Sequence, residues 1–265
     1  MSQKILKFNI NGPSAFFKDP SVNKETFLTF ECISKTHILG IIGAIMGFSG
    51  YNLKAIKKKL LLEQIENENN KEKKENLKEK LNEFDSKFPD FYEKLKDCKV
   101  SIIENKNPIK KVHIYNNSTG MSSANGDIYN SKEQWLHFVD WDIYLTTNNL
   151  ELLNEIFDKM YNKKGIYTPY LGSNSHFCNI CNVELLDLES INSNENIIDS
   201  IVIVDEDIEI DEDDVEYDYL KYFYLPIGFN KELQSYEIAK FVNTNAYISN
   251  VKNLYKVKNK IIQLF

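Results

Sequence analysis

One segment rich in small residues constrains the fold of this chain more than any other feature of its sequence. Within residues 35–48, Gly40, Gly43, Ala44 and Gly47 recur at intervals of three and four. Side chains at these intervals share one face of an α-helix. An interior glycine costs a helix about 0.5–1 kcal/mol relative to alanine. We therefore expect a helix that begins near Ser34 and holds its small face against another backbone.

Hydrophobic periodicity on either side of this segment predicts strands. Leu6, Phe8 and Ile10 alternate with polar neighbours, which is typical of a half-buried strand. Further extended segments are expected at residues 27–33, 100–103, 112–115, 138–145 and 179–186. Apolar stretches after residue 200 predict a β-rich C-terminal part.

Two more helical regions complete the pattern. Residues 52–98 are highly charged but carry apolar side chains at helical spacing, which predicts an amphipathic helical insertion. Asn148 and Glu151 form a capping-box pattern, and the helix that they open is expected to end at Gly165. The order over residues 1–186 is then strand, helix, strand, strand, helix, strand, which is that of a ferredoxin-like (RRM-like) sheet. The predicted fold class is α+β.

The formal charge of −7 is unevenly distributed along the chain. Ten acids lie between Asp205 and Asp218, and the rest of the chain carries a formal charge of +3. All the cationic side chains apart from histidine are lysines, so phosphate contacts would be point charges with little sequence selectivity. The acidic block is expected to be a solvated loop, a surface that repels RNA, or a docking site for a basic partner.

Apolar length and cysteine content indicate a compartment. The longest apolar run, residues 38–48, is shorter than the roughly 20 residues that cross a bilayer, and no signal-peptide pattern opens the chain. Its four cysteines are too few and too scattered for a disulfide framework. We expect a cytoplasmic protein with reduced thiols and no membrane partner.

The strand expected at 112–115 carries a candidate binding face. Lys111, His113 and Tyr115 alternate with Val112 and Ile114, so the first three share one face and the last two are expected in the core. Cations and stackable rings on a sheet suit RNA. A solvated outer face of an antiparallel strand would show the same pattern, and both interpretations remain open.

Two other clusters have alternative explanations. Lys35 and Thr36 at the start of the glycine-rich helix could bind a phosphate or only cap the helix. His176, Cys178 and Cys181 resemble part of a zinc site, but a structural zinc takes four ligands and no second pair completes this one. We expect no metal and no cofactor.

Several motifs in order resemble one protein family. Residues 4–12 form a short strand that ends in an aromatic residue and a glycine, and Phe16, Phe17 and Lys18 follow. The glycine-rich helix comes next, then a Tyr170-Leu-Gly turn, and more weakly residues 225–229. This series resembles family five of the CRISPR-associated proteins, the RAMP-type subunit of type I Cascade complexes, and most closely its I-B branch. Residues 52–98 and 187–220 match poorly.

The resemblance implies a fold and a partner. It implies a ferredoxin-like RAMP domain over residues 1–188, with the insertion at about 52–98 and a thumb-like loop at about 116–131, followed by a C-terminal β-rich extension over 189–265. It also implies an antiviral subunit that binds the 5′ handle of the guide RNA (crRNA) and contacts the Cascade backbone subunit and large subunit. Target DNA would be a partner only through the complex. The RNA-binding residues expected are Lys18, Lys35, Thr36, Lys110, Lys111, His113, Tyr115, Tyr170, Gly172 and Ser173.

Two other functions remain open beside this non-catalytic role. In the I-C branch of the same family the subunit cuts repeat RNA without a metal, a reaction that needs a base for the 2′-OH and a cation near the phosphate. Lys111 and His113, helped by Tyr51, are the candidates for that chemistry. The third possibility is a protein-only docking module that uses the charged insertion.

Overall fold

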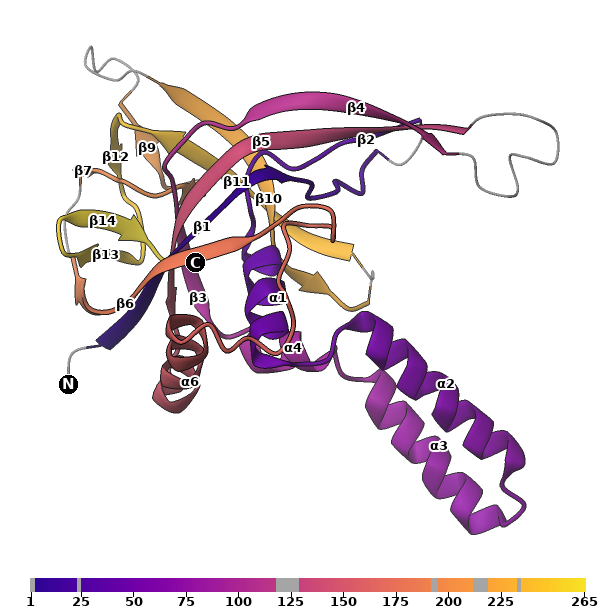
Figure 1. Ribbon diagram of the computed structural model, residues 1–265. Helices are drawn as coiled ribbons and strands as arrows, with labels where there is room; N and C mark the ends of the chain where they lie inside the picture. The colour runs from indigo at the N-terminus through magenta and orange to yellow at the C-terminus, as the bar shows by residue number, and fades with distance from the viewer. Residues whose placement is uncertain (1–2, 23–24, 118–128, 192–194, 212–218, 233–234) are drawn as a thin grey trace.

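The computed structural model describes residues 3–22, 25–117, 129–191, 195–211, 219–232 and 235–265. It shows an α+β protein built on a central mixed sheet (Figure 1). The helices are α1 (Lys35–Met46), α2 (Tyr51–Asn67), α3 (Lys71–Asp85), α4 (Asp90–Leu95) and α6 (Leu150–Tyr161). The strands of the first 190 residues are β1 (Gln3–Ala15), β2 (Thr26–Phe27), β3 (Lys99–Glu104), β4 (Ile109–Asn117), β5 (Tyr129–Thr146) and β6 (Asn179–Ser190). The later strands are β7 (Glu195–Ile197), β8 (Val202–Ile203), β9 (Glu209–Ile210), β10 (Leu220–Asn230), β11 (Ser235–Thr244), β12 (Tyr247–Ser249), β13 (Leu254–Val257) and β14 (Lys260–Gln263).

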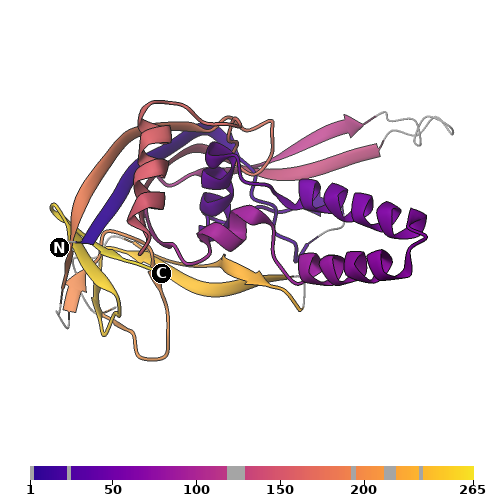
Figure 2. The ribbon, with the colours of Figure 1, turned by 90° about the horizontal axis from the view of Figure 1, so that it is seen from below.

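The central sheet is organised around β1 and β5. Its strand order is β14-β13-β6-β1-β5-β2, and β3 and β4 also pair with β5. The pairs β6–β1, β1–β5 and β5–β3 are antiparallel, whereas the short β2 joins β5 in parallel. Leu6, Phe8 and Ile10 near the start of the chain are fully buried as expected, but Asn9 between them is buried as well. α1 and α6 lie on one face of this sheet (Figure 2).

The glycine-rich segment forms α1, with Ser34 as its N-cap as expected. Another backbone does approach its small residues near the C-terminal end, where the amides of Ile166 and Tyr167 donate to the carbonyls of Ile45 and Ala44. A Cβ at Gly43 would lie 2.6 Å from the Cβ of Phe91 in α4. At that position the close neighbour is therefore a side chain.

The expected capping box of the second helix is wrong by one residue. Asn149 is the N-cap of α6, and its side chain accepts a hydrogen bond from the amide of Leu152 at 3.1 Å. The helix ends at Tyr161 instead of Gly165. Residues 162–167 turn away to reach the carbonyls of α1, which ends the helical run before the glycine.

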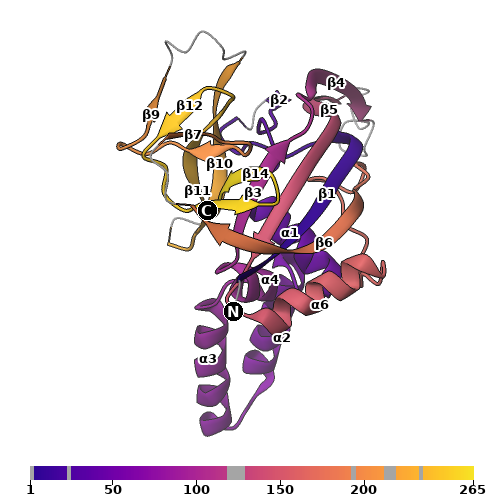
Figure 3. The same ribbon diagram turned by 90° about the vertical axis from the view of Figure 1, so that its left-hand side faces the viewer.

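The insertion is a projecting helical hairpin. α2 and α3 contain no buried residue, and the hairpin extends away from the sheets at the end opposite β7, β9 and β12 (Figure 3). α4 returns the chain to the core, where Tyr92 and Leu95 are buried. In the described part of the chain no single helix is long and apolar enough to span a membrane, although α1 and α2 pass that test as a pair bent by 68°.

Residues 195–265 form two small sheets and also extend the central one. One small sheet has the order β10-β11-β8 and the other β7-β12-β9. β13 pairs with the end of β6 and carries β14 with it, so these two strands belong to the central sheet. Phe223, Leu225 and Phe241 share one apolar cluster with the first strands of the chain.

Candidate nucleic-acid interface

β4 and the first half of β5 form an antiparallel ribbon that extends beyond α1 and α6, here called the β arm (residues 109–117 and 129–137; Figure 1). Its register places Lys111 opposite Trp135 and His113 opposite Glu133. Directly opposed residues of an antiparallel pair lie on the same face. The arm therefore gathers cationic, aromatic and acidic side chains from two strands on one side.

A histidine pair lies on this face. The Nε2 atoms of His113 and His137 are 2.8 Å apart, so one ring donates, the other accepts, and the accepting ring is neutral. Burial, together with the charges of His113 and Lys111, lowers the pKa of His137. The pair can therefore present one neutral imidazole beside one that can be protonated.

Trp135 connects the histidine pair to the body of the protein. His113 stacks on its ring with centroids 4.1 Å apart, and His176 meets the ring edge-on at 4.5 Å. His176 is buried, and its Nδ1 lies 2.7 Å from the hydroxyl of Ser14 in β1. Its buried Nε2 has no hydrogen-bond partner among the described residues. Burial lowers the pKa of His176, although the Glu133 carboxylate opposes that shift.

The outer end of the face is formed by Tyr115. Its ring lies 5.6 Å from Trp135, whose Nε1 donates to Glu133 at 3.0 Å. Burial and the Glu133 carboxylate raise the pKa of the Tyr115 phenol, so it stays a neutral hydrogen-bonding group. Stacking rings with adjacent polar atoms can bind unpaired bases.

The expectation that Val112 and Ile114 enter the core is wrong. Their side chains are 52% and 62% exposed, because β4 projects past α1 and α6 and nothing described covers its other face. On the polar face, His113 is only partly exposed and Tyr115 is 37% exposed, whereas Lys111 is exposed.

The Tyr170-Leu-Gly turn lies beside the same region. Gly172 has φ of +88°, and a Cβ there would lie 1.8 Å from the carbonyl oxygen of Phe16, so the turn requires glycine. The carbonyl of Ser173 accepts from the amide of His176 at 3.0 Å, which holds His176 toward Trp135. Tyr170 is half exposed and, with Gly172 and Thr36 of α1, lines a cavity of about 200 Å³.

The expected lysines are dispersed. Lys35 donates to the carbonyl of Phe265 at 3.2 Å, and burial lowers the pKa of its ammonium. Lys18 lies 4.3 Å above the ring of Phe27. Lys110 forms an ion pair with Glu31, and Lys111 is exposed on the arm.

Tyr51 and the cysteines have neighbours elsewhere. Tyr51 contacts Phe229 of β10 at 5.9 Å and lines a separate groove at the base of the helical hairpin. Cys178 is buried, and the Sγ of Cys181 accepts a hydrogen bond from the side-chain Nδ2 of Asn11 at 3.5 Å. Within the described ranges, no group of three histidine, cysteine or acidic side chains could hold a metal. The expected thumb-like loop lies mostly outside the described residues.

Trp135 and His137 are not among the residues expected from the sequence, and His176 was considered there only as part of a zinc site. The signal was present, because residues 133, 135 and 137 alternate just as 111, 113 and 115 do. A change in the phase of the alternation obscured it. Phe138 has φ of +60°, and both Leu136 and Val139 are buried, so the phase of the alternation changes inside β5.

Comparisons with known proteins give only solved chains, at low identity and with TM-scores below 0.5. No protein-family model matches the chain, and no curated protein matches it at a significant level. A solved chain titled "CRISPR RNA-guided surveillance complex" is similar with 11% identity and a TM-score of 0.47, over 91% of this chain and 90% of that one. A "Crystal structure of Cas protein" gives 10% identity and a TM-score of 0.43, over 91% and 94% of the two chains. A chain of the "Type III-B Cmr-beta bound to cognate target RNA and AMPPnP" gives 12% identity and a TM-score of 0.40, over 92% and 86%.

Proposed function

We propose that this protein is the non-catalytic, cytoplasmic subunit of a type I-B Cascade complex that binds the 5′ handle of the guide RNA through the β arm. The observation on which this proposal rests is a row of three rings in contact on one face of a projecting ribbon, formed by Tyr115, Trp135 and His113. Single-stranded RNA is commonly bound by bases stacked on aromatic rings with cations near the phosphates. Lys111 on the same face supplies a cation.

Two further features support the assignment. The strand order β6-β1-β5-β3 with antiparallel neighbours is the order expected of a ferredoxin-like sheet, in which strands one to four lie as 4-1-3-2. The glycine-rich helix and the Tyr170-Leu-Gly turn, on which the family resemblance depends, line one cavity through Gly40 and Gly172. The backbone and large subunits of Cascade are the partners that this proposal implies.

The test is a binding assay with labelled repeat RNA. Replacing His113 and Trp135 together by alanine should weaken binding by about tenfold or more, since a stacked base contributes about 1–3 kcal/mol. Val112→Ala with Ile114→Ala is the matched control, because these residues lie on the other face of the same strand. Equal affinity of the two double variants would contradict the proposal.

The histidine pair favours a second function, metal-independent cleavage of repeat RNA. A neutral His137 could accept the proton of a 2′-OH while a protonated His113 gives one to the leaving 5′ oxygen, with Lys111 near the phosphate. Tyr51 is placed apart from this pair. Discrete cuts in the presence of a chelator, lost in His137→Ala and kept in Tyr51→Phe, would favour cleavage. A shift without cuts would favour the binding subunit. The absence of both a shift and cuts would favour a protein-only docking module.

A further inference from the structure

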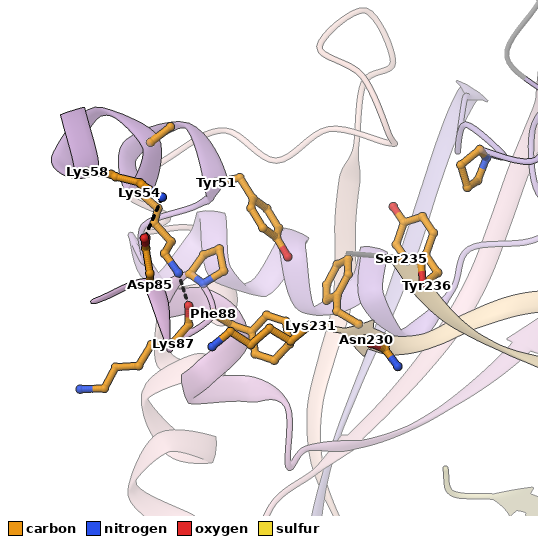
Figure 4. Close-up of a pocket in the computed structure, with 14 residues that line it drawn as sticks. Tyr51, Lys54, Lys58, Asp85, Lys87, Phe88, Asn230, Lys231, Ser235 and Tyr236 are labelled. Carbon is orange, nitrogen blue, oxygen red and sulfur yellow. Dashed lines mark hydrogen bonds and ion pairs between the residues drawn. The ribbon is translucent and has the colours of Figure 1, made fainter. Parts of the chain in front are cut away.

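A groove of about 940 Å³ lies where the base of the α2–α3 hairpin faces the β10–β11 hairpin (Figure 4). Its walls come from segments far apart in the sequence, with Tyr51 and Lys54 from α2, Phe88 after α3, and Phe229 and Tyr236 from the two strands. These residues are separate from those of the β arm.

Aromatic rings form one wall of the groove. Phe229 lies 5.9 Å from Tyr51, 6.4 Å from Phe88 and 5.3 Å from Tyr236. Tyr51 is 52% exposed, so its ring is available to a ligand. Phe88, Phe229 and Tyr236 are partly exposed in the same groove, so they can add contacts to a ring that stacks on Tyr51.

Cations surround these rings. Four lysines and one carboxylate line the groove. Lys58 is paired with Asp85 at 2.7 Å and Lys87 with Glu83 at 2.6 Å. Within the described ranges, Lys54 and Lys231 make no ion pair. Lys54 donates to the carbonyl of Lys87, and Lys231 lies 5.8 Å above the ring of Phe88.

The two unpaired lysines also repel one another. Burial and then the charge of Lys231 lower the pKa of the Lys54 ammonium, and the Asp85 and Glu93 carboxylates only partly offset this shift. A bound anion between them would remove this cost. Charge and geometry therefore both favour an anionic ligand.

We propose that this groove is a second site for single-stranded nucleic acid, which stacks a base on Tyr51 and places phosphate near Lys54 and Lys231. A nucleic acid strand offers a flat ring and a negative charge in each unit, and both features of the groove are then used. An acidic peptide would use the lysines and leave most of the rings without a partner. The proposal does not depend on the function proposed for the arm.

The test measures binding of a labelled octauridylate, which lacks any repeat sequence, to the full chain over a range of salt concentrations. The slope of log affinity against log salt is negative. Lys54→Gln with Lys231→Gln should reduce its magnitude by about 1.4, since each phosphate contact to a single strand contributes about 0.7. Tyr51→Ala should weaken binding by about tenfold with the slope unchanged. Ultraviolet crosslinking of the bound strand should modify Tyr51 or Phe88.

The matched control is Lys73→Gln with Lys80→Gln, which removes the same charge from exposed positions of α3 outside the groove. The proposal is overturned if the control reduces the magnitude of the salt slope as much as the Lys54 and Lys231 variant does. It is also overturned if crosslinks fall only on the arm, or if the chain does not bind octauridylate. Competition by polyglutamate as strong as that by unlabelled octauridylate would overturn it in favour of an acidic protein partner. Arm variants that leave repeat-RNA binding unchanged would refute the function proposed for the arm and leave this groove standing.

Discussion

Gly172 shows at the scale of one residue why the Tyr170-Leu-Gly turn requires a glycine. Its positive φ and the carbonyl oxygen of Phe16, 1.8 Å from where a Cβ would be, exclude any side chain. Gly172→Ala should therefore lower the free energy of unfolding by at least about 2 kcal/mol, from left-handed backbone strain and the displacement of the β1 end. Chemical denaturation measures this.

Gly40→Ala is the control for that experiment. Gly40 lies within α1, and a Cβ there would meet nothing within 4 Å. Alanine should stabilise the helix by about 0.5–1 kcal/mol. Equal effects of the two substitutions would contradict the steric argument.

His37 gives a second prediction at this scale, concerning pH. Burial lowers its pKa to about 4, and its Nδ1 lies 2.7 Å from the hydroxyl of Ser34. The unfolded chain binds the proton near pH 6.5, so the unfolded state binds more protons between about pH 6.5 and 4. The contribution of neutral His37 to the free energy of unfolding is therefore complete above about pH 6.5. About 3 kcal/mol of it is lost as the pH falls to about 4.

The measurement compares unfolding free energies at pH 7 and pH 4 in the native chain and in His37→Gln. The variant should lose about 3 kcal/mol less than the native chain over this range, because glutamine does not titrate. The same loss in both proteins would show that the acid sensitivity comes from other groups.

At the scale of elements, the helical hairpin should be separable from the stability of the body. α2 and α3 bury none of their residues. Replacing residues 60–81 by a short glycine-containing turn should leave the thermal midpoint within about 3 °C, since a change of about 1 kcal/mol moves a protein of this size by about 2–4 °C. A midpoint lowered by much more would mean that the hairpin supports the core.

The β arm shows what the sequence could and could not predict at this scale. The alternation at Lys111, His113 and Tyr115 correctly identified a strand face, because the period of two is a local property. Which strand lies opposite is decided by non-local pairing, so Trp135 could not be placed there. Burial of the alternate side was also assumed, although a ribbon that leaves the body has no buried side.

For other elements too, the sequence predicted what local signals decide and missed what depends on distant residues. α1 was predicted with its N-cap because both signals lie within one segment, and the start of α6 was missed by one residue because Asn148 and Asn149 can both cap. The pairing of β13 with β6 was not foreseen, since nothing local in Tyr255 or Ser190 specifies it.

At the scale of the whole molecule, the first and last parts of the chain share structure. The backbones of Val100 and Phe265 exchange two hydrogen bonds of 2.9 and 3.0 Å, and the amide of Ile201 donates to Ile102. Phe241 is fully buried in the same cluster as Phe8. These contacts join the small β10-β11-β8 sheet to the central sheet through one core.

The domain boundary expected at residue 188 can therefore be tested directly. A fragment of residues 1–188 would expose the apolar surface that Phe223, Leu225 and Phe241 cover, and it should lack near-ultraviolet circular dichroism and a cooperative melt. In the full chain, Phe241→Ala should cost about 3–5 kcal/mol and shift one single transition, because the deleted ring supports both sheets. A fragment 1–188 that melts cooperatively, or a variant whose transition splits in two, would instead establish two independently stable units.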